Sequence, residues 1–393
     1  MWQLLQISAA VDREFLGALS TQVRAVGWLP EMRTLDIFAP VEREERLHDP
    51  PARVRRFPLQ KGYSQWPFSL IADIAVKQTA RLKRAVSDPV RSPLICTTPY
   101  WAPVAEKWPG PVVYYLTDLM AAYDGANRDR VRSLDKRMCR AANMVCPNSS
   151  RIAGYLQMQA ACSPSKIEVL PNATRASNVL GSAPAEPFPL PPDLVGLKRP
   201  VAGVIGNLAS NMDWTFLEET IERTPDFSWT FVGPIDMAIR DPEQRKARVR
   251  LMASGGRIRF TGGKPYGRLS AYARAFDVAV LPYFRREPTF SGSSTRFYEH
   301  LAACRPMIAT CGFEELLRKS PLLKLVSGAA EAAEAMHQLQ SQRFNDGLLE
   351  LRWRTSRVET WEVRASRMIG ALKDRLPALE HMYCPQAKAG RSL

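Results

Sequence analysis

One short segment carries hydroxyl, guanidinium and carboxylate groups at a spacing that suits a phosphate-bearing sugar. A loop rich in Gly and Ser leads into a segment with Arg296 near its start and Glu299 three residues later. Backbone N–H groups at the start of a helix favour a phosphate, and a guanidinium there adds a charge-assisted contact. An ionised carboxylate only accepts hydrogen bonds, so Glu299 suits two sugar hydroxyls. The alternative is that Glu299 only complements the dipole of the predicted helix.

The residues on either side predict the elements that position this loop. Residues 278–281 form an apolar run that ends at Pro282, as in a buried parallel strand, and residues 307–310 form a second strand. Strand, loop, helix and strand make a βαβ unit, and its loop lies at the carboxyl end of a strand. Ligands of parallel sheets bind at this edge. The segment therefore favours a nucleotide-sugar site over an ordinary core helix.

Three glycines earlier in the second half each follow a predicted strand, namely Gly206, Gly233 and Gly262. Any one of them alone is better explained as an ordinary turn that needs a positive φ. Three around one predicted sheet favour a ligand site at its carboxyl edge. Polar residues follow two of these glycines, and we include Asn207, Lys264 and Tyr266 among the candidate donor-binding residues. Lys264 is as well explained as a solvated loop lysine.

The pattern of elements predicts two α/β domains, which is also the expectation for 393 residues. Residues 1–178 form the first domain, and residues 201–360 form the second. Between them, residues 179–200 are rich in proline and are predicted to be the linker. Residues 361–393 contain a terminal helix.

The segment 276–310 resembles the donor-binding region of GT-B glycosyltransferases in the branch called glycosyl transferases group 1. The residues that carry the resemblance are Glu287, Ser293, Ser294, Arg296 and Glu299, followed by the run His300-Leu301-Ala302-Ala303-Cys304-Arg305-Pro306. The chain departs from the family pattern at Ser294 for Pro, Arg296 for Lys and Cys304 for Gly. Arginine retains the charge of lysine with a different contact geometry.

The resemblance implies a GT-B fold, in which two doubly wound Rossmann-like domains face each other across a cleft and the terminal helix crosses back to the first domain. It implies a donor site in the second domain. Its residues would be Gly206, Asn207, Gly233, Gly262, Lys264, Tyr266, Glu287, Ser293, Ser294, Thr295, Arg296 and Glu299. Arg296 would also be catalytic, because it counters the charge of the leaving diphosphate.

Asp118 is the second candidate catalytic residue, since it ends an aromatic-rich predicted strand, residues 112–116, in the first domain. As a general base it would deprotonate an acceptor hydroxyl. An N-cap for the following helix is at least as good an explanation. Asn172 lies in an apparent N-glycosylation sequence but is better explained as a turn at a strand end.

The composition excludes several other classes. Seven cysteines without Cys-x-x-Cys pairs indicate a reducing compartment, and four scattered histidines give no metal motif. We therefore expect no metal and no cofactor beyond the nucleotide-sugar substrate. No apolar run reaches the roughly 18 residues that a membrane span needs. We predict a cytoplasmic protein.

The positive charge is concentrated in one window. The net charge is +15, and residues 51–91 contain nine Lys and Arg against two Asp. Aromatic residues lie among these bases, which favours a peripheral contact with an anionic membrane surface over a merely solvated basic face. The candidate membrane or acceptor face consists of Arg53, Arg55, Arg56, Tyr63 and Trp66.

The function predicted from the sequence is transfer of a sugar from a nucleotide-sugar, which the family resemblance implies is a UDP-sugar, to a saccharide or lipid-linked acceptor. Relatives of this type build bacterial surface polysaccharides, and the protein would then act at the inner face of the cytoplasmic membrane. The alternatives are a sugar-nucleotide epimerase or a phosphorylase on the same fold. A basic nucleic-acid-binding protein ranks lower, because the chain contains no recognisable reader motif.

Overall fold

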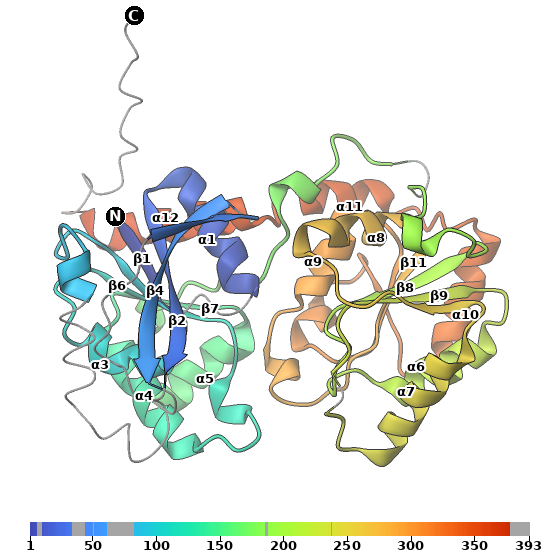
Figure 1. Ribbon diagram of the computed structural model, residues 1–393, viewed down its shortest axis with the longest axis horizontal. Helices are drawn as coiled ribbons and strands as arrows, with labels where there is room; N and C mark the ends of the chain where they lie inside the picture. Colours follow the sequence, from blue (N-terminus) through green and yellow to red (C-terminus); the bar gives the residue numbers. More distant parts are fainter. Residues whose placement is uncertain are drawn as a thin grey trace, which may run out of the picture. The chain divides into compact units, whose positions relative to one another are not determined.

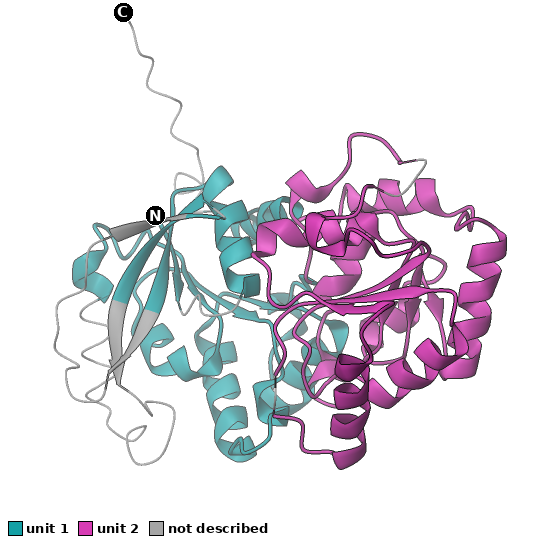
Figure 2. Ribbon diagram, turned by 45° about the vertical axis from the view of Figure 1, so that its right-hand side comes forward, with its two compact units in different colours: residues 1–171, 361–393 teal, residues 172–360 magenta. Residues whose placement is uncertain are grey.

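The computed structural model describes residues 1–5, 10–33, 44–49, 51–60, 82–184, 188–236 and 238–377. The chain divides into two compact units, coloured separately in Figure 2. The first unit comprises Met1–Pro171 and Trp361–Leu393, and the second comprises Asn172–Thr360.

The first unit is built on a sheet of seven strands in the order β3-β4-β2-β1-β5-β6-β7. All neighbouring strands pair in parallel except β3, which runs antiparallel to β4 at one edge. The strands are β1 (Trp2–Leu5), β2 (Ala25–Arg33), β3 (Glu44–His48), β4 (Pro51–Gln60), β5 (Leu94–Cys96), β6 (Val112–Leu116) and β7 (Met144–Pro147). The helices are α1 (Ala10–Gln22), α3 (Ala102–Ala105), α4 (Arg128–Ala141), α5 (Ser150–Ala160) and α12 (Trp361–Arg375).

The terminal helix α12 completes the first unit although it follows the whole of the second unit in sequence. It packs beside α1, as Figure 1 shows. The Gln22 side chain donates to the Glu362 carbonyl at 2.8 Å, and its Oε1 accepts from the Ser366 hydroxyl at 2.8 Å. Ala365, Met368 and Leu372, which lie on the buried face of α12, are almost fully enclosed.

The second unit is built on a parallel sheet in the order β10-β9-β8-β11-β12-β13. The strands are β8 (Val201–Ile205), β9 (Ser228–Val232), β10 (Ile258–Phe260), β11 (Val278–Leu281), β12 (Met307–Ala309) and β13 (Lys324–Leu325). In order of sequence this is 3-2-1-4-5-6, the arrangement of dinucleotide-binding folds. After β8 the chain adds β9 and β10 on one side of that strand, and it then adds β11, β12 and β13 on the other side. The point between β8 and β11 is therefore a topological switch point, which is where ligands bind.

Six helices surround this second sheet on both faces. They are α6 (Trp214–Arg223), α7 (Pro242–Ser254), α8 (Leu269–Ala275), α9 (Thr295–Ala302), α10 (Ala329–Ser341) and α11 (Leu349–Ser356). Figure 1 shows α8, α9 and α11 on one side of the sheet and α6, α7 and α10 on the other. Because both faces are covered, β11 is apolar at every position and wholly buried.

The predicted βαβ unit is present, with β11 and β12 paired in parallel around α9. Ser294 is the N-cap of α9, and its hydroxyl accepts a hydrogen bond from the Phe297 N–H at 3.3 Å. At the other end of α9, Cys304 adopts φ 60. This left-handed conformation is the one that favours glycine after a helix, which explains why the family pattern has glycine where this chain has cysteine.

The segment predicted to be the linker, 179–200, belongs to the second unit in its described part. Leu194 and Leu197 are buried in a core cluster with β8 and α8. Arg199 forms an ion pair with Asp277 at 2.8 Å. The boundary lies instead after Pro171, and the buried Leu194 and Leu197 tie the described part of this segment to the core of the second unit.

The long strands β2 and β4, which follow the edge strand β3 in the first sheet, were not predicted from the sequence. In β4, which pairs with β2 from Gly27↔Val54 onward, basic residues alternate with buried Ala52 and Val54. Charged residues at every second position obscured the strand, although this alternation is itself typical of a half-buried strand.

We expect Gly233→Ala to destabilise the protein by about 3 kcal/mol, combining a backbone clash with an unfavourable φ. Gly233 has φ +151, and a Cβ built on it would lie 1.7 Å from the Gly206 carbonyl oxygen. The matched control is Gly181→Ala, whose Cβ would have no neighbour within 4 Å and whose φ is not positive. Urea denaturation measures both; equal midpoints for the two variants would contradict the close approach.

Candidate donor and acceptor sites

The three predicted glycines lie together at the carboxyl edge of the second sheet. The Gly206 N–H donates to the Val232 carbonyl, and the Gly233 N–H donates to the Gly262 carbonyl, each at 3.0 Å. Gly206, Gly233 and Gly262 all have φ between +70 and +151. Asn207, the next residue after Gly206, is exposed. The ends of β8, β9 and β10 are therefore joined by backbone hydrogen bonds, and at Gly233 a Cβ would clash with the Gly206 carbonyl.

Arg296 lies directly over the switch point between β8 and β11. A Cβ on Gly206 would be 3.4 Å from Arg296 Nε and 3.3 Å from the Tyr283 hydroxyl. The Arg296 guanidinium also lies 5.9 Å from the centre of the Tyr266 ring. Its Nη1 atom is buried and has no hydrogen-bond partner among the described residues. A buried N–H without a partner is uncommon and points to a ligand acceptor at this position.

Glu299 lies on α9 beyond its first turn, so the structure does not support the alternative role of complementing the helix dipole. Its carboxylate is 1% exposed. Oε1 accepts a hydrogen bond from the Tyr266 hydroxyl at 2.7 Å, and Oε2 accepts one from the Asn178 amide at 3.1 Å. These two bonds orient the buried Glu299 carboxylate.

Tyr266 connects the two charged residues of the predicted site. Its hydroxyl binds Glu299, while its ring lies near two guanidinium groups, Arg296 at 5.9 Å and Arg175 at 5.3 Å from the ring centre. An aromatic face attracts cations, at about 0.5–1 kcal/mol for an exposed contact. Tyr266 thus contacts Glu299, Arg296 and Arg175 together at the carboxyl edge of the second sheet.

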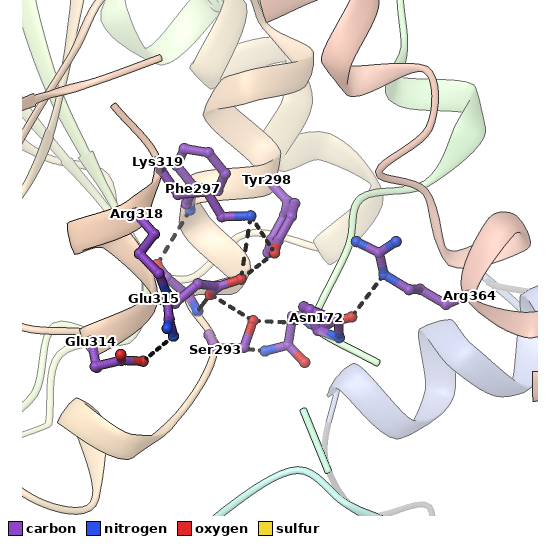
Figure 3. A network of polar contacts seen from close by, with 11 residues as sticks. Asn172, Ser293, Phe297, Tyr298, Glu314, Glu315, Arg318, Lys319 and Arg364 are labelled. Carbon is purple, nitrogen blue, oxygen red and sulfur yellow. Dashed lines mark hydrogen bonds and ion pairs between the residues drawn. The ribbon is translucent and has the colours of Figure 1, made fainter. Parts of the chain in front are cut away.

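A buried carboxylate, Glu315, accepts hydrogen bonds from the loop before α9 (Figure 3). Its Oε2 accepts from the Ser293 hydroxyl at 2.8 Å and from the Ser294 N–H at 3.0 Å. Its Oε1 accepts from the Tyr298 hydroxyl and lies 3.6 Å from Lys319 Nζ. Ser293 and the Ser294 N–H therefore bind Glu315, and their predicted role toward a donor stays a prediction.

Asn172 also forms hydrogen bonds with this loop. Its side-chain amide donates to the Ser293 carbonyl at 2.7 Å and to the Thr295 hydroxyl at 2.9 Å. Its backbone N–H donates to the Ser293 hydroxyl at 3.0 Å. The amides of Thr295 and Arg296 begin α9, where a helix leaves its first N–H groups without intrahelical partners.

Two further predicted donor residues make contacts within the second unit. Lys264 forms an ion pair with Asp193 at 2.8 Å, and this hydrogen bond raises the pKa of Lys264. Glu287 accepts a hydrogen bond from the Ser291 N–H at 3.2 Å and so braces the turn before the loop. Their roles toward a donor stay predictions.

Sequence reasoning missed Glu315, Asn178 and Tyr283. Glu315 is close to the predicted strand 307–310 in sequence, but nothing in its own neighbourhood shows that it is buried. Asn178 is the last residue of the predicted first domain, 1–178, and so was not expected beside a site in the second. Tyr283 follows β11 directly, and its position at the carboxyl end of a central strand was the signal that could have identified it.

Asp118 lies at the carboxyl end of β6 in the first unit. It is not the N-cap of the helical turn that follows, because that position belongs to Leu119. Burial raises the pKa of the Asp118 carboxyl to about 6, although a hydrogen bond from Tyr123 acts in the opposite direction. A carboxyl with a pKa near neutrality suits general acid–base chemistry.

The predicted membrane face is only partly described. Arg53 is exposed on β4, whereas Arg55 donates to the Ala85 carbonyl at 2.6 Å and lies 5.7 Å from the Trp28 ring centre. Arg56 is half-buried. Tyr63 and Trp66 lie outside the described residues. Contact with a membrane surface stays a prediction, and part of its expected charge is engaged inside the first unit.

The described ranges contain neither a metal-binding cluster nor a membrane-spanning helix. In residues whose placement is described, no group of three or more His, Cys, Asp or Glu could hold a metal ion. None of the helices in the same part of the chain is long and apolar enough to cross a membrane.

We expect Glu315→Gln to destabilise the protein by about 2 kcal/mol, because one buried donor loses its acceptor. The adjacent Glu314 is the matched control, since it pairs with exposed Arg318 at the surface. Glu314→Gln should change stability by less than about 0.5 kcal/mol. Urea midpoints followed by tryptophan fluorescence give both values, and an unchanged midpoint for Glu315→Gln would show that the loop does not depend on this carboxylate.

Comparisons with known proteins find similar folds among glycosyltransferases. No protein-family model matches the chain. The putative teichuronic acid biosynthesis glycosyltransferase TuaH of Bacillus subtilis (strain 168) is 19% identical over 261 residues, which is 64% of this chain and 64% of that protein. The match thus spans less than two thirds of that relative's length.

Solved structures match over nearly the whole chain. Sucrose-phosphate synthase from Thermosynechococcus elongatus has a TM-score of 0.67 and 17% identity, covering 96% of this chain and 100% of that chain. Anabaena HepE in complex with UDP and glucose has a TM-score of 0.64 and 16% identity, covering 98% and 100%. A glycosyltransferase from Rickettsia africae has a TM-score of 0.65 and 13% identity, covering 96% and 99%. The predicted α/β architecture and the resemblance are confirmed: this chain has the GT-B fold of glycosyltransferases.

Proposed function

We propose that this chain is a glycosyltransferase that moves a sugar from a UDP-sugar to an acceptor hydroxyl. The observation that carries the proposal is the buried, unpartnered Nη1 of Arg296 beside Gly206 at the switch point of the second sheet. An N–H at that place suits a phosphate oxygen. A UDP donor is further supported by HepE, which has a similar fold and is solved with UDP and glucose.

Arg296 would act on the leaving group. In the transfer, a bond forms between the acceptor oxygen and the anomeric carbon, and the bond from that carbon to the diphosphate oxygen breaks. The diphosphate leaves with the electron pair, so negative charge on it grows toward the transition state. A guanidinium fixed in place by Tyr266 stabilises this growing charge more than the charge of the bound donor.

Glu299 would hold the sugar of the nucleotide. It is oriented by the Tyr266 hydroxyl and the Asn178 amide, and it is acceptor-only when ionised. Two ribose hydroxyls would donate to this carboxylate. Tyr266 therefore links the group that would bind the ribose to the group that would bind the phosphate.

Asp118 would serve the acceptor as general base. It takes the proton of the attacking hydroxyl, which balances the transfer because the diphosphate departs as an anion. Its raised pKa supports this role, since a stronger base removes a hydroxyl proton more readily. The proposal extends to a saccharide or lipid-linked acceptor in bacterial surface polysaccharide synthesis, supported by the name of the relative TuaH.

We place the enzyme in the cytoplasm, at the inner face of the membrane. The free thiols of the described cysteines, among them Cys96, Cys146 and Cys304, are consistent with a reducing compartment. Arg53 is exposed on β4, in the basic window that would face an anionic surface.

We expect Arg296→Ala to lower the turnover of a UDP-sugar by about 100-fold or more, as removal of an oxyanion donor does. Arg296→Lys should retain part of the activity, because it keeps the charge without the fork of N–H groups. Turnover is measured as UDP released from a panel of UDP-sugars. The matched control is Arg245→Ala, an exposed arginine on α7, which should leave turnover unchanged.

The same assay separates the proposal from its rivals. Release of UDP with transfer of the sugar to a hydroxyl supports a transferase. An epimerised sugar still joined to its nucleotide, or a reaction that requires inorganic phosphate, would replace the proposal by an epimerase or a phosphorylase. Equal turnover by Arg296→Ala and the native protein would remove Arg296 from the mechanism.

The pH profile tests Asp118. A general base acts only when ionised, so kcat/KM should rise with pH up to about 6, the pKa of the Asp118 carboxyl, and stay level above it. Tyr123→Phe removes a hydrogen bond that lowers this pKa, and the rise should therefore move to higher pH. Asp118→Asn should abolish the dependence together with most of the activity. A profile that is flat from pH 5 to 7 would contradict the assignment.

A further inference from the structure

Tyr283 lies at the carboxyl edge of the second sheet, directly after the strand β11. Only Pro282 separates it from Leu281, the last residue of that strand. In the sheet β11 lies beside β8, so Tyr283 comes to the switch point at which Arg296 also lies. The proposed transfer gives this tyrosine no role.

The position of Tyr283 is fixed by close contacts with the loop that follows β12. Its N–H donates to the Thr310 hydroxyl oxygen at 2.8 Å, and its carbonyl accepts from the same hydroxyl at 2.6 Å. A Cβ on Gly312 would lie 2.3 Å from Tyr283 Cβ, so the two backbones approach closely. The ring makes an edge contact with Phe313, with 5.1 Å between the ring centres. Tyr283 is 6% exposed, and these contacts hold its side chain in place.

The Tyr283 hydroxyl and the Arg296 guanidinium converge on one point beside Gly206. A Cβ built on Gly206 would lie 3.3 Å from the Tyr283 hydroxyl oxygen and 3.4 Å from Arg296 Nε. The two groups come from different segments, the end of β11 and the first turn of α9. Since both lie so near a single point, they are close enough to each other to contact the same phosphate group.

Neither of these two polar groups is fully satisfied within the protein. The Tyr283 hydroxyl forms no hydrogen bond with the described residues, whereas an enclosed tyrosine hydroxyl usually has a partner. The Nη1 atom of Arg296 is buried and likewise without a partner in that part of the chain. An arginine N–H can only donate, so the missing partner of Arg296 is an acceptor. Two such groups at one place indicate a ligand that brings acceptor oxygens.

The Tyr283 hydroxyl is a donor at neutral pH. Burial raises its pKa above the ordinary value for tyrosine, although the charge of Arg296 acts in the opposite direction. The hydroxyl therefore keeps its proton and can donate a hydrogen bond to an anionic oxygen.

We propose that Tyr283 donates a second hydrogen bond, beside that of Arg296, to the diphosphate of the bound nucleotide-sugar. This inference rests on the proposed function, because it concerns the same leaving group. The tyrosine keeps its proton throughout. Negative charge on the diphosphate grows as the bond to the anomeric carbon breaks, so this hydrogen bond is stronger in the transition state than in the bound donor. Arg296 supplies charge, and Tyr283 supplies a fixed neutral donor from a different segment of the chain.

Tyr283→Phe tests the proposal, because it removes only the hydroxyl and retains the ring that contacts Phe313. The full-length protein is compared with this variant in three measurements: the Kd of UDP by calorimetry, kcat as UDP released from a panel of UDP-sugars, and Tm. We expect the Kd to weaken about fivefold. We expect kcat to fall about tenfold or more, less than for a charged donor. The Tm should equal that of native protein, since the hydroxyl has no partner among the described residues to lose.

The matched control is Tyr155→Phe in the first unit, whose hydroxyl donates to Asp135 Oδ2 at 2.7 Å. This variant should lower Tm and leave both the Kd of UDP and kcat unchanged. Native values of Kd and kcat in Tyr283→Phe would overturn the proposal. A fall in the Tm of Tyr283→Phe with an unchanged Kd would also overturn it, because the hydroxyl would then serve only the fold.

Binding and turnover are measured separately so that this proposal and the proposed function can fail independently. If native protein binds UDP but releases none from any UDP-sugar, the transferase proposal fails. The Kd of Tyr283→Phe then still decides whether the hydroxyl contacts the diphosphate. If native protein binds no UDP, both proposals are overturned.

Discussion

A buried carboxylate determines the shape of the loop on which the proposed donor site depends. Glu315 accepts hydrogen bonds from the Ser293 hydroxyl and the Ser294 N–H, and this fixes the point at which α9 begins. From that start, helical geometry sets the direction of Arg296 and Glu299, because residues three apart lie on nearly the same face. Lys319 and the Tyr298 hydroxyl supply the partners that an acid needs in the interior.

The order of the second sheet explains why these side chains meet the glycines. β8 and β11 are neighbours although two strands and three α-helices separate them in sequence, so Gly206 comes to lie beside the loop that follows β11. Gly233 can approach the Gly206 carbonyl only because it has no Cβ. A Cβ on Gly206 would lie 3.4 Å from Arg296 Nε, so the glycine leaves room for this guanidinium beside the strand end.

The two edges of this sheet carry positive charge in different ways. At the carboxyl edge Arg296 is half-buried and rests near the Tyr266 ring, so it can reach a ligand directly. At the amino edge Arg305 is enclosed, and both oxygens of nearby Asp277 accept hydrogen bonds from other donors.

Much of the second unit could be predicted from the sequence, because its signals are local. Residues 278–281 are continuously apolar, Ser294 caps a helix, and Arg296 and Glu299 have the spacing of one turn. The contacts that orient those residues could not be predicted in this way. Asn178 reaches Glu299 across 121 positions of sequence, and Glu315 depends on burial that its own neighbours do not encode.

The first unit was less predictable for a related physical reason. In β4, arginines alternate with small buried residues, and the charge obscured the strand. The proline-rich segment was misassigned because proline indicates an irregular backbone but does not tell whether apolar residues between the prolines are buried. Leu194 and Leu197 are in fact buried on the second sheet.

The return of α12 to the first unit also has a consequence for synthesis on the ribosome. The second unit is one uninterrupted stretch, 172–360, and its strands and helices are all available once that stretch has emerged. The first unit, although its sheet is made earlier, lacks the partner of α1 until Trp361–Arg375 follows. The face of α1 that packs on α12 therefore stays uncovered until the whole second unit has been synthesised. The first unit is synthesised first, but it is the second to be completed.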